Sequence, residues 1–338
     1  MKIYQTEEIR NIALIGGAKS GKTTMAEAMV FEGKVISRRG NVDDKNTVSD
    51  YRPIELDRQH SVHSTLMYSV YNEKKINIID VPGFSDFVGD TAAALNVCDT
   101  ALFMVNGQSG VEATSEIAWG QTEISSCPTV FAVNQLDHQG ANFNDSVNSL
   151  KEYFGDKVTV IQYPVSIGEG FNTIIDLMLM KQLKFNNNGG EPEISDIPDS
   201  EKDKADDLHL TLVENAAEGD EKLMEKYFEN DTLTLEEMRE GVRLGMISRS
   251  IFPVMCTSAK SGIGATRVMD FITNSCPAPN EMRERETTNG KAFKTSTSDP
   301  TALFVFKTSI EQHLGEVSCF KLYGGTLTEG MDLINPIL

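Results

Sequence analysis

The stretch GGAKSGKT at residues 16–23 constrains the fold of this chain more than any other, because it fits the pattern GxxxxGK[ST]. It follows an apolar run, IRNIALI, which predicts a buried strand, and precedes TTMAEAMVFEGK, which is typical of a helix. Glycines let a backbone wrap a phosphate chain with successive N–H groups pointing inward, and the helix N-terminus adds its dipole. A glycine-rich turn is the alternative. The predicted phosphate-binding residues are Gly16, Gly17, Ala18, Lys19, Ser20, Gly21, Lys22, Thr23 and Thr24.

Two positions of this loop and one later motif predict the handling of the phosphate end. Lys22 is expected to reach the β- and γ-phosphates, and the Thr23 hydroxyl to bind Mg²⁺. The motif DVPG follows the strand-like run KKINII, so Asp80 ends a strand where its carboxylate can hold the Mg²⁺ shell. The N–H of Gly83 is then placed to sense the γ-phosphate. The pattern DxxG alone often marks an ordinary turn. The phosphate-binding loop that precedes it here favours its interpretation as part of a nucleotide site.

A second motif predicts which base is bound. The run NQLD follows the apolar strand TVFAV and matches the guanine-binding pattern NKxD at Asn134 and Asp137, with Gln135 in place of the lysine. A carboxylate at Asp137 can accept two hydrogen bonds from guanine N1–H and the 2-amino group, which adenine cannot supply. A strand-ending Asx turn is the alternative. Backbone N–H groups of a later strand end are expected to contact guanine O6, from Ser258, Ala259 and Lys260.

Short apolar strands that alternate with helices predict an α/β fold with a mostly parallel sheet. The runs STLMYSVY and KKINIID flank Asn72-Glu73, a plausible hairpin turn. We predict a domain at 1–290 that carries a helical, acidic insert at about 160–253. The alternating tail after Pro279 predicts a linker and the first strands of a β-barrel at 291–338, too little sheet to stand alone. The chain is therefore expected to stop inside that barrel.

Composition narrows the class of protein. No apolar run is long enough to span a membrane, and the start MKIYQTEEIR lacks an apolar signal region, so we expect a cytoplasmic protein. The five cysteines are scattered without metal-ligand spacing, which favours reduced core thiols. The net charge is −19, but residues 191–240 hold 18 acidic and 5 basic residues. Most of the acidity therefore belongs to the insert, and a contact with RNA elsewhere stays open.

The chain carries four motifs, namely GGAKSGKT, DVPG, NQLD and the stretch TSAK at 257–260. Their order and spacing resemble those of the translational GTPases, and the match is closest to elongation factor G. Further stretches carry the resemblance, namely KKINIIDVPGFSDF, NGQSGVEATSEIAW and the tail FVFKTSIEQHLGEVSCFKLYGGTLTEG. The resemblance implies a P-loop GTPase fold with an insert and a following β-barrel domain. It implies GTP and GDP as ligands with Mg²⁺, and the ribosome, including ribosomal RNA, as the partner. It also implies a monomer whose acidic insert faces the ribosomal stalk protein.

The departures from the resembled family lie at the nucleotide. Lys19 stands where the family usually has an aspartate associated with a monovalent cation. The segment DRQHSV at 57–62 stands where the family has a glycine, an isoleucine and a Mg²⁺-binding threonine. Ser61 then takes the place of that threonine, although Ser64 or Thr65 could serve instead. The Mg²⁺ ligands expected are therefore Thr23, Ser61 and Asp80.

The largest departure is Phe84, which replaces the histidine that orients the attacking water in the family. Phenylalanine has no donor or acceptor, so hydrolysis is expected to be slow while binding survives. The catalytic positions expected are Lys22, Gly83 and Phe84. The function expected is GTP-dependent, ribosome-stimulated translocation of the elongation factor G type. The alternatives are normal turnover with water held by another group, His60 or His63 among the candidates, and a non-hydrolysing ribosome-binding regulatory or protection factor.

Overall fold

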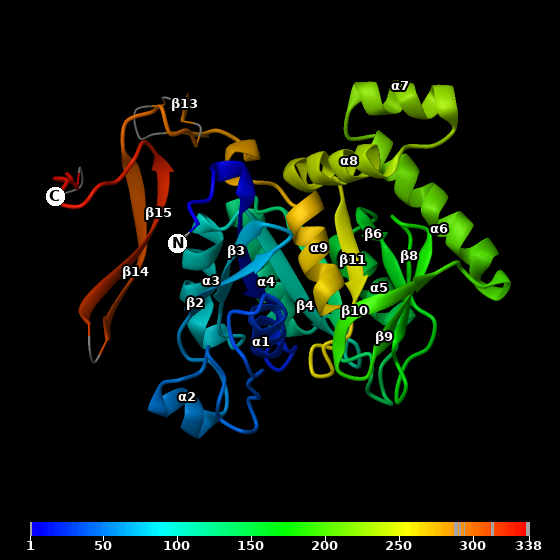
Figure 1. The fold of residues 1–338 in the computed structure, drawn as a ribbon, viewed down its shortest axis with the longest axis horizontal. Helices are drawn as coiled ribbons and strands as arrows, with labels where there is room; N and C mark the ends of the chain where they lie inside the picture. The colour runs from blue at the N-terminus through cyan, green and yellow to red at the C-terminus, as the bar shows by residue number, and fades with distance from the viewer. Residues whose placement is uncertain (1, 287–289, 291, 294, 312–313, 336–338) are drawn as a thin grey trace.

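A mixed sheet with strand order β2-β3-β1-β4-β5-β11-β6 runs through the described part of the chain (Figure 1). The computed structural model describes residues 2–286, 290, 292–293, 295–311 and 314–335. Every neighbouring pair is parallel except β2 with β3, so the predicted mostly parallel α/β fold is confirmed. The strands are β1 (Ile9–Ile15), β2 (Thr65–Tyr71), β3 (Lys74–Asp80), β4 (Thr100–Asn106), β5 (Thr129–Asn134), β6 (Val158–Val160) and β11 (Phe252–Cys256).

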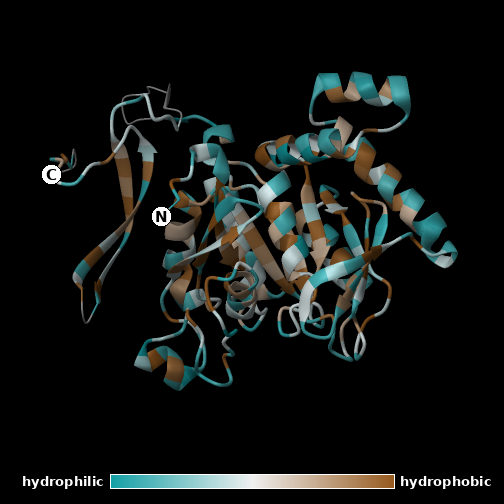
Figure 2. Cartoon of the chain, in the orientation of Figure 1, coloured by the Kyte–Doolittle hydropathy of each residue, from teal (hydrophilic) through white to brown (hydrophobic). Residues whose placement is uncertain are grey.

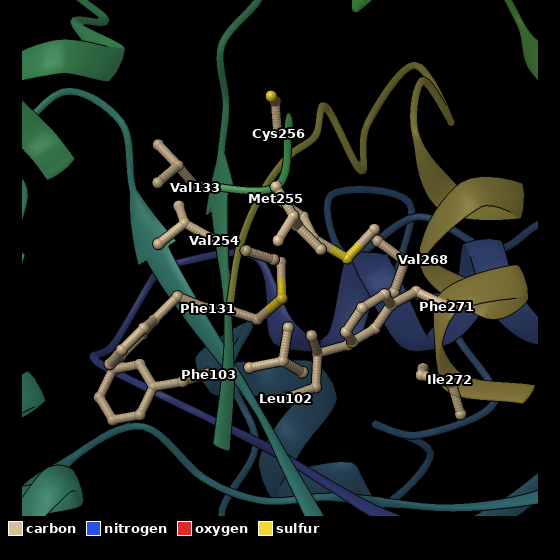
Figure 3. Close-up of a cluster of buried hydrophobic side chains, with 14 of the residues drawn as sticks. Leu102, Phe103, Phe131, Val133, Val254, Met255, Cys256, Val268, Phe271 and Ile272 are labelled. Carbon is tan, nitrogen blue, oxygen red and sulfur yellow. The ribbon is translucent and has the colours of Figure 1, made fainter. Parts of the chain in front are cut away.

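Helices cover both faces of this sheet. Helices α1 (Lys22–Glu32) and α9 (Ala265–Ser275) pack together on one face, and α3 (Val88–Val97) and α4 (Ala113–Ser125) pack together on the other. Figure 3 shows the core between them, where Phe103 and Phe131 lie close to each other below Val254. The remaining elements here are α2 (Pro53–Arg58), α5 (Phe143–Phe154) and the 3₁₀ turns η1 (Thr6–Glu8), η2 (Ser85–Phe87) and η3 (Pro279–Glu281).

The predicted hairpin and core thiols are confirmed. Asn72 and Glu73 join β2 to β3 with φ values of 47° and 61°, the left-handed pair that a tight two-residue hairpin requires. All five cysteines are free, and four of them are buried. Among the described residues, no helix is long and apolar enough to cross a membrane.

The first part of the insert is a sheet, and the prediction of an all-helical insert was wrong there. An antiparallel sheet of order β10-β9-β8-β7 spans residues 162–195. Its strands are β7 (Gln162–Pro164), β8 (Thr173–Asp176), β9 (Lys181–Asn186) and β10 (Gly189–Ser195). Short apolar runs do not distinguish helix from strand by periodicity, and here Leu183 and Phe185 alternate inward with exposed neighbours.

The second part of the insert is helical, as predicted. It consists of α6 (Asp199–Ala217), α7 (Glu221–Asn230) and α8 (Leu235–Ser248). Figure 2 shows that the outward side of α6 and α7 is mainly hydrophilic, whereas the sheet below carries the apolar strands. Helix α7 buries only Leu223, so it adds little to the core and lies mostly in solvent.

The tail predicted as β is a long antiparallel ribbon of β14 (Ala302–Glu311) and β15 (Gly315–Gly324). It lies beside α3 and the loop before β2. The Lys321 ammonium reaches the Asp99 carboxylate at 2.5 Å, and the Glu311 carboxylate accepts from Arg52 at 3.2 Å. The short strand β12 (Arg285–Glu286), at the end of the predicted first domain, pairs with β13 (Ala292–Phe293) in the predicted linker. Residues 287–289, 291 and 294 lie outside the described residues.

A buried ion pair joins the insert to the main sheet domain. The Arg267 guanidinium on α9 donates to the Asp176 carboxylate on β8 at 2.6 Å, and Asp176 is 1% exposed. The Gln162 amide donates to the same carboxylate oxygen at 2.7 Å. Removing Asp176 leaves the buried guanidinium with Asp270 as its remaining carboxylate partner, and it leaves the Gln162 amide and the Leu179 N–H without their acceptor. Breaking a buried, hydrogen-bonded ion pair in this way is strongly destabilising.

We therefore predict that Asp176→Ala lowers the free energy of unfolding by about 3–5 kcal/mol, measured by urea denaturation. The matched control is Asp196→Ala, which breaks the exposed pair with Lys181 and is expected to leave the unfolding midpoint unchanged. Equal effects of the two substitutions would contradict a special role for the buried pair.

Candidate nucleotide-binding site

The loop between β1 and α1 has the form of an anion cradle. Within the described residues, the N–H groups of Ala18, Lys19 and Gly21 have no hydrogen-bond partner. The first N–H groups of α1 follow directly and lack intrahelical partners by the geometry of a helix. Gly21 has φ 93°, and a Cβ there would lie 2.2 Å from the Asn134 amide nitrogen. Only glycine fits this position, so the sequence pattern has a steric cause.

The side chain of Lys22 lies inside this cradle. Its ammonium donates to the carbonyls of Gly16 and Gly17 at 3.1 and 2.7 Å. Burial lowers the pKa of Lys22 to about 8, and the nearby Asp80 carboxylate opposes that shift. A Cβ on Gly83 would lie 2.3 Å from the Lys22 ammonium nitrogen. The backbone of Gly83 therefore closes on the cradle, as expected for a residue that senses the terminal phosphate.

Asp80 is the centre of a buried oxygen cluster. Its Oδ2 accepts hydrogen bonds from the hydroxyls of Thr23 and Ser49, both at 2.7 Å. Its Oδ1 is buried and has no partner among the described residues. Burial raises the pKa of Asp80 to about 6, although both hydroxyls act in the other direction. A fully buried carboxylate oxygen without a donor is suited to bind a cation or a further hydrogen-bond donor.

The structure selects one hydroxyl from the candidates before β2. The Ser61 hydroxyl lies 3.2 Å from the Thr23 hydroxyl, inside the cluster. The Ser64 hydroxyl instead bonds to Asp90 at 3.4 Å, and the Thr65 hydroxyl donates to the Ser49 carbonyl at 3.0 Å. Ser61 is therefore the candidate that meets Thr23 and Asp80, the other two predicted ligands.

Sequence reasoning missed two members of this cluster, Ser49 and Asp50. Asp50 is 4% exposed, and its Oδ1 is buried without a hydrogen-bond partner among the described residues. Burial raises the pKa of Asp50, and the nearby Ser61 hydroxyl acts in the other direction. Both residues lie in the long polar loop before α2. Nothing in their local sequence marks them, because the loop has no periodicity that would show which side chains turn inward.

The donor set fits Mg²⁺. Hydroxyls of Thr23 and Ser61 and the open oxygen of Asp80 are hard oxygen ligands gathered at one point. Mg²⁺ usually takes one or two carboxylates and completes its shell with water and substrate phosphates, so a cage made wholly of protein groups is not required. Among the described residues, no group of three acidic, histidine or cysteine side chains forms another metal site.

Asn134 ties three loops together at the other end of the site. Its amide nitrogen donates to the Ser20 carbonyl at 2.8 Å, and its amide oxygen accepts from the Ala259 N–H at 2.8 Å. The Thr257 hydroxyl donates to the same oxygen at 3.2 Å. Asn134 is 1% exposed. In this structure it positions the phosphate loop against the loop after β11 and leaves no amide surface open to a ligand.

The remaining predicted base-binding residues lie on the loops that Asn134 connects. The Gln135 amide donates to the Lys19 carbonyl at 2.8 Å, so this side chain contacts the phosphate loop. The half-buried Asp137 carboxylate has no partner among the described residues. The N–H groups of Ser258 and Ala259 are already paired, with the Ile263 carbonyl and Asn134. Of the three N–H groups predicted to meet guanine O6, Lys260 alone has no recorded partner within the described residues.

Phe84 follows Gly83 at the mouth of the site. It is 37% exposed, and its ring lies 4.7 Å from the ring of His60, with the planes at 53°. His60 precedes Ser61, and Phe84 follows the closing glycine. The two loops that flank the phosphate end therefore meet through these two rings.

The raised pKa of Asp80 predicts a pH dependence. The folded chain holds this proton more tightly than the unfolded chain, whose carboxyl has the ordinary pKa of 3.8. The resulting stability is fully present below about pH 3.8 and is lost as the pH rises through about 6. Without Mg²⁺, the loss should be on the order of 3 kcal/mol. Urea denaturation in chelator from pH 4 to 7.5 should show this step, and parallel profiles for wild type and Asp80→Asn would contradict it.

The open carboxylate of Asp137 predicts a change of base preference. Asp137→Asn replaces an acceptor by an amide that can donate to the extra carbonyl of xanthine. We expect GDP affinity to fall by about 10²-fold or more, since two hydrogen bonds to a charged group are lost, and xanthosine diphosphate to bind better than GDP. Calorimetric titration with both nucleotides measures this. Asp156→Asn, in the turn after α5, is a control expected to change neither affinity.

Comparison with known proteins agrees with this geometry. The family described as the elongation factor Tu GTP binding domain matches residues 7–278, well over half of the chain. A solved structure, the crystal structure of ttk003000868 from Thermus thermophilus, superposes with a TM-score of 0.83 at 28% sequence identity. The match covers 94% of this chain and 46% of that one, so this chain spans about half the length of the solved protein.

The matched segment contains the phosphate loop, Asp80, Asn134 and Asp137, the residues that form the site. It ends before the β14–β15 ribbon, whereas the match to the solved structure covers a larger share of this chain. The chain therefore belongs to the translation-factor GTPases that carry the elongation factor Tu GTP binding domain, a family that binds GTP and GDP.

Proposed function

We propose that this chain is the GTP-binding part of a translation elongation factor of the elongation factor G type, which works in the cytoplasm as a monomer. It binds GTP with Mg²⁺, engages the ribosome and supports translocation, with hydrolysis slower than in relatives that carry a histidine at position 84. The observation that carries this proposal is the cluster of Thr23, Ser61 and Asp80 beside Lys22 and Gly83. The family membership and the resemblance to elongation factor G support the rest.

The residues of the chain divide the work at the phosphate end. Thr23, Ser61 and Asp80 would hold Mg²⁺, which neutralises charge on the β- and γ-phosphates when bound. Lys22 replaces its hydrogen bonds to loop carbonyls with bonds to phosphate oxygens, because the ammonium is already inside the cradle. The backbone of Gly83 lies close to the Lys22 ammonium, so its N–H would report the terminal phosphate to the segment that follows it.

Phe84 limits the chemical step. Hydrolysis by this class of site depends on positioning a water and on electrostatic stabilisation of the γ-phosphate. A phenyl ring can exclude bulk solvent, but it neither accepts a hydrogen bond from a water nor donates one. Loss of a group that orients the nucleophile costs about 10²–10⁴-fold in rate. Nucleotide binding is expected to persist, since the phosphate loop, Asp80 and Lys22 are in place.

One observation favours a second function, a GTP-dependent regulatory or protection factor that binds the ribosome without hydrolysis. That observation is again Phe84, whose side chain cannot orient a water. A factor that acts by binding GTP alone does not require a water-orienting side chain at this position. The large insert at 162–248 counts against the tetracycline-resistance type of protection factor, which resembles this family but lacks such an insert. Ribosome-stimulated turnover distinguishes the two functions.

The acidic insert is proposed as the contact for the ribosomal stalk protein. Helix α7 projects from the body of the domain, and Phe228 on it is 75% exposed among acidic neighbours (Figure 1). An exposed aromatic ring within an acidic helix suits a partner with a basic rim around an apolar pocket. A solvated subdomain without a partner is the plainer alternative.

The proposed function predicts the behaviour of Phe84→His. GTP turnover should be measured with and without ribosomes for the wild type and this variant, alongside nucleotide affinity. We expect unchanged GDP affinity and a rise of about 10²-fold or more in ribosome-stimulated turnover, because the imidazole restores a water-orienting group. Phe87→His, in the turn that follows, is the matched control. Wild-type turnover already as fast as that of the histidine variant would contradict a rate limit set by Phe84.

A further inference from the structure

His60 occupies a position from which it can act on the terminal phosphate. It directly precedes Ser61, whose hydroxyl lies in the oxygen cluster, and its ring packs against Phe84 at 4.7 Å. Phe84 in turn follows Gly83, whose backbone closes on the Lys22 ammonium. The imidazole therefore lies at the junction of the two loops that flank the phosphate end. It is half-buried there, whereas a histidine with no role in such a loop is usually solvated.

One hydrogen bond fixes the tautomer of this ring. His60 Nδ1 lies 3.1 Å from the Ser61 carbonyl oxygen. A carbonyl oxygen only accepts, so Nδ1 carries the proton in this bond. In the neutral ring, Nε2 then holds a lone pair, and it has no partner among the described residues. The ring thus presents a fixed hydrogen-bond acceptor, held by its own backbone, which is what orienting a water requires.

The two rings differ in what they can offer at this junction. Phe84 has no hydrogen-bond donor or acceptor, whereas His60, packed against it, has an Nε2 without a partner among the described residues. We propose that His60 is the catalytic residue that orients the attacking water for the hydrolysis that remains, with Phe84 as the apolar wall beside it. This inference rests on the proposed GTPase function.

The chemical step balances without a further reactant. Nε2 of the neutral ring accepts a hydrogen bond from the water, whose oxygen forms a bond to the γ-phosphorus. The bond from that phosphorus to the bridging oxygen breaks, and its electron pair stays on GDP. The proton lost by the water ends on the released phosphate, so the imidazole is unchanged after turnover.

A second histidine in the same loop supplies a matched control. His63 lies three residues further, and its side chain is exposed. Its backbone N–H bonds to the buried Glu55, but the ring has no recorded contact within the described residues. His63→Ala therefore tests for a general effect of removing an imidazole from this loop.

The experiment uses His60→Ile, His60→Gln, His63→Ala, Phe84→His and the double variant His60→Ile/Phe84→His. Single-turnover GTP hydrolysis is measured with and without ribosomes, and GDP affinity is measured separately. We expect His60→Ile to lower the hydrolysis rate by about 10²-fold at unchanged GDP affinity. His60→Gln should retain part of the rate, because its amide oxygen still accepts, and His63→Ala should match the wild type. Phe84→His and the double variant should both turn over faster than His60→Ile, and the double variant should at least regain the wild-type rate, since its imidazole lies on the other loop.

The outcomes separate this inference from the function on which it rests. A chain that binds no GTP overturns both. A chain that binds and hydrolyses GTP at the same rate with and without His60 overturns the inference and leaves the function standing. Undetectable hydrolysis by the wild type, with tight GTP binding, also overturns the inference and favours the regulatory function. Circular dichroism and unfolding midpoints of all variants exclude misfolding as the cause, and a slow, folded His60→Ile that the double variant rescues supports the inference.

Discussion

The buried carboxylate of Asp80 is the interaction on which the rest of the site depends. It ends β3, where the parallel strands deliver their carboxyl ends, and one of its oxygens holds hydroxyls from α1 and from the loop before α2. Burying a charge costs free energy unless a partner compensates for it. The other oxygen has no such partner among the described residues. This position therefore suits either a protonated carboxyl or a carboxylate whose charge a cation compensates.

The same cluster explains how a long polar loop is held in place. Ser49, Asp50 and Ser61 turn inward to the cluster, while Glu27 on α1 accepts from the N–H groups of Gly40 and Val48. Glu27 is fully buried. Hydrogen bonds to buried carboxylates therefore hold this loop in place, as apolar packing does in other parts of the chain. The position of the loop then depends on the charge of these carboxylates, which links it to the ionic state of the nucleotide site.

The β14–β15 ribbon extends this network beyond the sheet domain. The Lys307 ammonium donates to the Ser64 carbonyl, and Glu311 accepts from the Tyr51 hydroxyl at 3.1 Å. These contacts lie on both sides of the segment that carries His60 and Ser61. A movement of the segment therefore has to break or shift contacts to the ribbon. Such a link would couple the state of the nucleotide site to the position of the β14–β15 ribbon, as a coupling free energy between the two.

Much of this architecture was predictable from sequence, and the misses have physical reasons. The phosphate loop, Asp80 and the Asn72-Glu73 hairpin are local patterns with steric or chemical causes, so they could be placed without a structure. The sheet at 162–195 was mistaken for helix because short apolar runs fit both periods. Ser49 and Asp50 were missed because their role is created by tertiary contacts alone.

The contact between His60 and Phe84 would let sequence position and chemical role separate. If His60 orients the water as proposed, an imidazole on the segment before Ser61 would do what one on the segment after Gly83 could also do, because the two segments meet through these rings. His60 in addition adjoins Ser61, a proposed Mg²⁺ ligand. Water orientation would then be lost whenever Ser61 leaves the cluster, so hydrolysis and the ordering of the loop would become one event.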